Sequence, residues 1–187
     1  MSATAQQEAI ASYVTDMLAL EEHIHKALAG QIADLTTEST LVEALRTAHR
    51  ACESHIEALS ALATRREIGA QGISEVVKRA AAGVLGIGAA AVDFVRGEKV
   101  AKNLRDDYAA LSLVCIGYVM LHTVGMALGD PEVATLAQQH LERHAKCVMH
   151  FQQIVPIAVV QQLIEDGLPA RIEVLAEVGE NVRRAWG

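Results

Sequence analysis

The stretch GYVMLHTVGMALGDPEVATLAQQHLERHAK, residues 117–146, contains two helical patterns that are separated by one sharp turn. The turn signal is Gly129-Asp130-Pro131. Glycine commonly ends a helix, aspartate caps the start of the next one, and proline is tolerated in the first turn. Apolar residues recur at helical spacing on both sides of these three residues. The stretch therefore predicts a hairpin of two antiparallel helices.

The same periodicity extends over most of the chain, and no convincing alternating strand pattern interrupts it. It predicts helices over residues 4–34, 40–66, 99–128, 131–166 and 170–186. Pro156 lies inside the fourth of these helices. We expect it to kink or stop that helix, because proline has no N–H to donate and its ring clashes with the preceding turn. The last helix is expected to be amphipathic, with a polar outer face.

Two helical hairpins joined by a longer connection form the plan of a ferritin-like bundle. We therefore predict one all-α domain, a ferritin-like antiparallel four-helix bundle with a long crossover segment and an extra C-terminal helix. The predicted parts are a first hairpin, a connector, a second hairpin and the C-terminal helix, at residues 1–66, 67–98, 99–166 and 170–186. A length of 187 residues fits such a single domain.

The composition excludes several classes of protein. Apolar residues make up 51% of the chain and there are only 3 prolines, which excludes a disordered or collagen-like chain. The net charge of −7 argues against a nucleic-acid binder, which needs a basic surface to neutralise phosphates. Cys52, Cys115 and Cys147 form no CxxC pair, which favours reduced core thiols. The first residues lack a signal-peptide pattern, so we expect a cytoplasmic protein.

The most apolar stretch is AAAGVLGIGAAAVDFV, residues 80–95, which Asp93 and Arg96 limit. It is shorter than the roughly 18–20 apolar residues that a membrane span requires, so we expect no transmembrane segment. Its GVLGIG part has no strand before it and no GK[ST] after it, which disfavours a phosphate loop. The mean hydropathy of +0.23 is high for a soluble protein. This predicts buried surface beyond one core, and hence a homo-oligomer, most simply a dimer.

Charged and imidazole groups on otherwise apolar helix faces are the candidates for chemistry. Glu21 shares a face with Met17 and Ile24, and a carboxylate is costly to bury there unless it is paired or metal-bound. In the helix predicted over 131–166, His144 points most clearly toward the core. The candidate metal ligands are Glu21, His49, Glu53, His122 and His144, of which His49 and Glu53 lie four residues apart on one helix face.

Each candidate also has a structural explanation. Glu21 can lie at the polar edge of its apolar stripe, beside Glu22. His49 and His55 belong to a helix rich in arginine, which favours a surface position. His122 can be a core histidine whose hydrogen bonds are satisfied by the protein. These alternatives stay open at the level of the sequence.

Two phenols, Tyr108 and Tyr118, lie on the core side of the helix predicted over 99–128. A phenol in that position can donate a hydrogen bond to a carboxylate or a ligand. No nucleophile stands out beside them, because the chain has no GxSxG motif and its cysteines lack flanking residues that would lower a thiol pKa.

Three stretches resemble a known family. EEHIHKAL, residues 21–28, is similar to the first-helix pattern EQQxLKAL of the YciE/YciF-like ferritin-like proteins, which are small bacterial stress-associated bundles. CESHIEAL, residues 52–59, resembles their second-helix stretch, roughly TExQIxRL, and residues 117–146 resemble their third-to-fourth helix hairpin. The resemblance covers about residues 13–151.

The resemblance implies a metal site, with departures from the family pattern. Ferritin-like di-iron sites use a Glu from each of two helices and a Glu-x-x-His from each of the other two. Glu21 and Glu53 match the first two carboxylates, whereas Leu111 and Val114 stand where the family tends to have acidic and histidine residues. Two iron ions need several carboxylates to neutralise them. The remaining groups are therefore expected to hold one divalent ion, Fe or Mn, rather than a pair.

Three functions are compatible with these observations. The favoured one is a ferritin-like, stress-associated bundle protein that is non-catalytic or binds metal weakly. The first alternative is a non-haem iron or manganese metalloprotein with oxidase-type activity. The second is a module that binds an apolar ligand or a membrane surface through residues 80–95.

Overall fold

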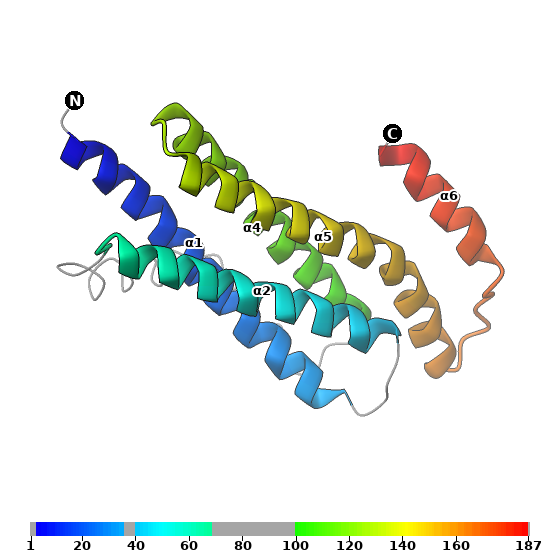
Figure 1. Cartoon of the computed structure of the whole chain (residues 1–187). Helices are drawn as coiled ribbons and strands as arrows, with labels where there is room; N and C mark the ends of the chain where they lie inside the picture. The colour runs from blue at the N-terminus through cyan, green and yellow to red at the C-terminus, as the bar shows by residue number, and fades with distance from the viewer. Residues whose placement is uncertain (1–2, 36–39, 69–99, 187) are drawn as a thin grey trace.

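The computed structural model describes residues 3–35, 40–68 and 100–186, and within them the regular structure is helical, with no strand. The all-α prediction is confirmed. The expected connector lies almost wholly outside the described residues, as do GVLGIG, Asp93 and Arg96. The described helices, drawn in Figure 1, are α1 (Ala3–Asp34), α2 (Thr40–Arg65), α4 (Val100–Ala127), α5 (Pro131–Glu165) and α6 (Val174–Trp186).

The turn between α4 and α5 forms as its sequence predicts. The backbone N–H of Val133 donates to the side chain of Asp130, which caps α5, at 3.1 Å. Gly129 has a φ of +68°, a left-handed conformation that glycine adopts without a steric penalty. Beside the turn, a Cβ atom on Gly125 would lie only 2.6 Å from the backbone nitrogen of Ala134. The absence of a side chain at Gly125 therefore allows α4 and α5 to approach closely.

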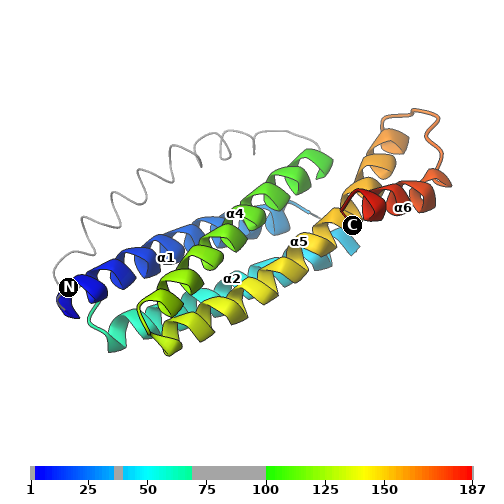
Figure 2. The ribbon, with the colours of Figure 1, turned by 90° about the horizontal axis from the view of Figure 1, so that it is seen from above.

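Four helices form a bundle in which each helix runs antiparallel to two neighbours. The α1–α2 and α4–α5 hairpins pack with α1 beside α4 and α2 beside α5, as Figures 1 and 2 show. Gln31 near the end of α1 donates to Asp107 near the start of α4. Arg66, just after α2, pairs with Asp130 at the start of α5. The end of α2 and the start of α4 therefore lie at opposite ends of the bundle.

The core is mainly aliphatic, as expected for a chain with 3% aromatic residues, and Tyr118 and Phe151 are fully buried aromatic side chains within it. Leucines of α1, α2 and α4 are fully buried, namely Leu28, Leu45, Leu59, Leu62, Leu104, Leu111 and Leu121, and α5 contributes the fully buried Phe151. α6 packs against α5 but has no buried residue. The expectation that Pro156 stops the fourth helix is wrong, because α5 continues to Glu165. Ile154 and Ala158 are both buried around Pro156, and this packing holds the helix together despite the lost backbone hydrogen bond.

Two helices, α4 and α5, are long and apolar enough to cross a membrane by length and composition alone. This is weak evidence, since core helices of soluble proteins meet the same criterion. α4 also presents large apolar side chains to solvent, of which Met126 is 66% and Ile116 is 58% exposed. No membrane-spanning segment was expected from the sequence, and that expectation stays a prediction.

Candidate metal centre

Glu21 lies in the middle of α1, and its side chain is fully buried. Met17, Ile24 and Leu28 on the same face are buried as well. The carboxylate therefore belongs to the core stripe of the helix and not to its polar edge. A buried carboxylate is costly unless hydrogen bonds or a cation compensate for the lost water. Its surroundings determine what this residue does.

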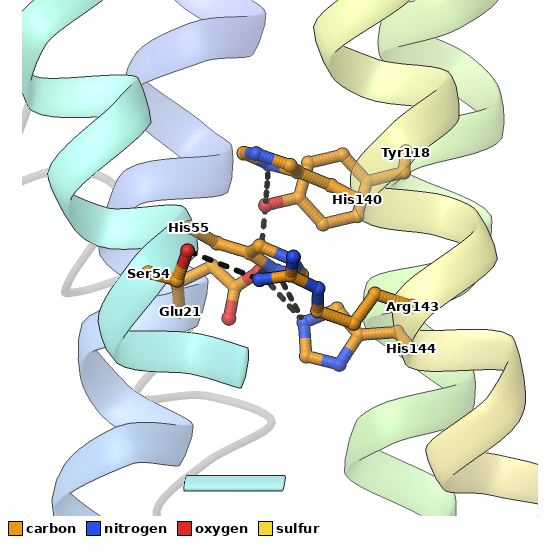
Figure 3. Close-up of polar contacts among 7 residues, drawn as sticks. All are labelled: Glu21, Ser54, His55, Tyr118, His140, Arg143 and His144. Carbon is orange, nitrogen blue, oxygen red and sulfur yellow. Dashed lines mark hydrogen bonds and ion pairs between the residues drawn. The ribbon is translucent and has the colours of Figure 1, made fainter. Parts of the chain in front are cut away.

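Three side chains from three other helices converge on one oxygen of Glu21 (Figure 3). The Tyr118 hydroxyl of α4 donates to Oε1 at 2.6 Å. His55 Nδ1 of α2 lies 2.8 Å from the same oxygen, and His144 Nε2 of α5 lies 2.7 Å from it. The two imidazole nitrogens are 3.0 Å apart. The side chains of Glu21, His55 and His144 are all buried, and their ligand atoms lie close enough together to hold one metal ion.

The electrostatics of the cluster favour an anionic carboxylate beside a neutral His55 ring. Burial alone would raise the pKa of Glu21, but hydrogen bonds from His144 and His55 outweigh this and lower it to about 2. Burial lowers the pKa of His55, which is neutral at pH 7. Burial, and then the charge of Glu21, raise the pKa of the Tyr118 phenol, so it keeps the proton that it donates. An ionised carboxylate and a neutral imidazole are the forms that bind transition metals.

His140 forms a second layer around the cluster. Its Nδ1 lies 3.0 Å from the Tyr118 hydroxyl. Because that hydroxyl donates its own proton to Glu21, it accepts here, and His140 carries its proton on Nδ1. The His140 ring also stacks on His55, with ring centroids 3.9 Å apart. Burial lowers the pKa of His140 to about 3, so this ring is neutral too. His140 thus fixes Tyr118, which in turn fixes the carboxylate.

The buried polar atoms of the cluster that lack a hydrogen-bond partner indicate whether it fits a metal ion. Without metal, His55 Nδ1 and His144 Nε2 both donate to Glu21, and the opposite nitrogens of the two rings have no hydrogen-bond partner among residues 3–35, 40–68 and 100–186. The outer oxygen of Glu21, Oε2, has none either. Two imidazoles and one carboxylate are a common ligand set for non-haem Fe(II) and for catalytic zinc. One buried carboxylate neutralises part of one divalent charge, so the cluster fits one ion and not two.

The structure brings together two of the five predicted ligands, Glu21 and His144. Glu53 is exposed on α2. His49 is half-buried and stacks on His25, with ring centroids 4.0 Å apart. His122 Nδ1 lies 2.8 Å from the backbone carbonyl of Ala134, so its hydrogen bond is satisfied within the protein. These three residues lie outside the Glu21 cluster.

Sequence reasoning missed His55 and His140 as members of the cluster. His55 was expected at the surface beside arginines, yet it lies in the stripe of Cys52 and Leu59, three residues after one and four before the other. All three are buried. His140 precedes His144 by four residues and so shares its helix face. Helical spacing from known core positions was therefore a usable signal for both histidines.

The fold and the site define an all-α helical bundle with a buried Glu/His/His cluster that could hold a metal ion. No family model, no curated protein and no solved structure matches this chain. The chemistry of the cluster is therefore inferred from its residues.

Proposed function

We propose that this chain is a ferritin-like metal-binding protein that holds a single divalent transition-metal ion through Glu21, His55 and His144. The observation that carries the proposal is the convergence of three buried ligand atoms from three helices, with mutual distances of 2.7–3.0 Å. Iron and manganese are the ions that the family resemblance implies. A stress-associated role, a cytoplasmic location and a dimeric state belong to the same proposal and rest on the sequence.

The directions of the helices support the ferritin-like part of the proposal. α1 and α2 form one antiparallel hairpin and α4 and α5 form another. The end of α2 and the start of α4 lie at opposite ends of the bundle. The second and third helices of the ferritin-like plan have the same relative directions. The cluster lies in the bundle core, where that plan places its metal sites.

Each residue of the cluster has a distinct role in holding an ion. Glu21 supplies the negative charge, and His55 and His144 supply neutral nitrogen ligands. Tyr118 orients the carboxylate through its 2.6 Å hydrogen bond, and His140 orients Tyr118. A bound ion would supply Lewis acidity or redox chemistry. Because the rings have no acceptor for their outer nitrogens among the described residues, we expect modest affinity.

The alternative of an oxidase-type enzyme rests on one observation. Three protein ligands leave positions on a four- to six-coordinate ion for water or a substrate. The same cluster thus serves either function, and turnover of a substrate would distinguish them. We favour the binding function, since no further acid, base or nucleophile is assigned to the cluster.

The proposal predicts that His144→Ala weakens binding of Mn(II) or Fe(II) by at least tenfold, because the ion loses one of three ligands. Isothermal titration of the metal-free protein measures this directly, with Fe(II) handled under argon. His49→Ala is the matched control, since His49 is a histidine of the same bundle outside the cluster. Equal loss of affinity in both variants, or no loss in either, would contradict the proposal.

A further inference from the structure

A groove of about 410 Å³ lies between α2 and α5, beside the metal cluster. It is lined by Thr47, Arg50 and Ala51 from α2 and by Arg143, Lys146, Cys147 and His150 from α5. The volume falls in the range of small-molecule sites, roughly 300–1,000 Å³. It is larger than a single inorganic anion needs. The groove therefore has room for a small organic molecule.

The charge of this groove is opposite to that of the chain. The whole chain carries a net charge of −7, yet the lining contains two arginines, a lysine and a histidine and no carboxylate. A carboxylate, Glu142, lines only the adjoining hollow, where Gln138 donates to it. Clustered cations attract anions, and of these four side chains only Arg50 has an acidic partner, Glu43, within the described part of the chain. The groove is therefore a local positive site on an acidic protein.

Two of the cations are positioned by α2. Arg143 Nη1 donates to the Ser54 hydroxyl at 3.0 Å, which holds its guanidinium across the gap between α5 and α2 (Figure 3). Arg50 Nη2 donates to Glu43 Oε1 at 2.7 Å. Arg50 Nη2 also donates to Thr47 Oγ1 at 3.2 Å. Each guanidinium has five N–H donors, so both arginines keep donors for a ligand. Lys146 has no ion-pair partner among residues 3–35, 40–68 and 100–186.

The floor of the groove is apolar and adjoins the metal cluster. Ala51 and Cys147 are both nearly buried, at 4% and 5% exposure. Cys147 follows His144 by one helical turn, and Ala51 precedes His55 by one turn. A ligand in the groove would thus place an apolar part on these two residues and a charged part among the cations. That combination suits an organic anion better than a neutral or cationic molecule.

We propose that the α2–α5 groove is a binding site for a small organic anion, whose carboxylate or phosphate contacts Arg143, Lys146 and Arg50 and whose apolar part packs on Ala51 and Cys147. Arg143 and Arg50 suit both anionic groups because guanidinium donors match their paired oxygens. The proposal does not require metal in the cluster, so the site is testable in metal-free protein.

The test uses phenyl phosphate and benzoate as probes. Two comparison compounds each lack one half of the proposed ligand: inorganic phosphate has no apolar part, and benzyl alcohol has no charge. Backbone amide shifts of the isotope-labelled, metal-free full chain report where each probe binds. We expect saturable shifts at residues 47–51 and 143–150 with one or both organic anions, and weaker binding of the two comparison compounds. The probe that binds tighter distinguishes a phosphate from a carboxylate site.

The double variant Arg143→Gln/Lys146→Gln should lower the affinity for the probe that binds more tightly by about tenfold or more, because charge-assisted hydrogen bonds are lost. Arg183→Gln is the control, since Arg183 is an exposed arginine of α6 outside the groove. Both substituted groove residues are exposed, so the fold should persist, which circular dichroism verifies. Absence of saturable shifts, equal binding of benzyl alcohol, or equal affinity in the groove and control variants would overturn the proposal.

Discussion

Glu21→Ala should lower the free energy of unfolding of the metal-free protein by about 3–5 kcal/mol. The Glu21 carboxylate accepts hydrogen bonds from Tyr118, His55 and His144 inside the bundle. Its removal leaves buried polar groups unpaired and opens a cavity that the aliphatic core cannot easily fill. Since whole domains are stable by about 5–15 kcal/mol, this is a large fraction of the total.

Urea denaturation at neutral pH measures the effect of Glu21→Ala. Glu22→Ala is the matched control, because Glu22 is the next residue on the same helix and is exposed. The control should change stability by less than about 0.5 kcal/mol. If both variants lose the same small amount, the carboxylate of Glu21 is not held by the hydrogen bonds described above.

Asp107→Asn should stabilise the protein at pH 8, on the order of 2–4 kcal/mol. Asp107 of α4 is 6% exposed, and one of its oxygens, Oδ2, has no hydrogen-bond partner in the part of the chain that the structure describes. Gln31 Nε2 donates to the other oxygen at 2.7 Å and supplies no positive charge. Burial raises the pKa of Asp107 to about 7, and the charge of Asp106 adds to this. Asparagine keeps the acceptor for Gln31 and removes the buried charge.

The sign of the pH dependence follows from these pKa values. Between about pH 4 and pH 7 the unfolded chain has lost the proton of Asp107 while the folded protein retains it. The contribution of Asp107 to stability is therefore present below pH 4, declines as pH rises and levels off above pH 7. The difference between wild type and Asp107→Asn should grow over the same window. Denaturation from pH 4 to pH 8 measures it, and a difference that does not change with pH would contradict the account.

Asp34→Asn serves as the control for that series. Asp34 is exposed at the end of α1, so its replacement removes a carboxylate without relieving a buried charge. We expect a change within about 0.5 kcal/mol at every pH. A gain equal to that of Asp107→Asn would attribute the stabilisation to net charge rather than to burial.

Features encoded locally were predictable from the sequence. Gly129, Asp130 and Pro131 define the α4–α5 turn through their own backbone preferences, and the turn forms as expected. Helical periodicity gave the boundaries of the first three long helices to within one residue. The effect of Pro156 was predicted wrongly, because the packing of α5 on the bundle outweighs one lost hydrogen bond. That packing is not visible in the sequence of one helix.

The candidate site was only half predictable, because its assembly depends on the register between helices. The apolar stripe around Glu21 and the inward face of His144 are visible in single helices. His55 reaches the same oxygen only at one axial position of α2 relative to α1. The sequence pattern of a single helix does not determine that position. Glu53 lies two residues from His55 and so points to a different face of α2. His122 finds its acceptor, the Ala134 carbonyl, only once α4 and α5 are packed.

The metal content of the untagged protein, grown with iron, manganese or zinc, tests the central claim most directly. Elemental analysis after removal of loosely bound ions should find about one transition-metal ion per chain in wild type, because the cluster has one buried carboxylate and two imidazoles. Glu21→Ala should retain little metal, since the only anionic ligand is gone. No metal in wild type, two ions per chain, or equal metal in both proteins would contradict the account.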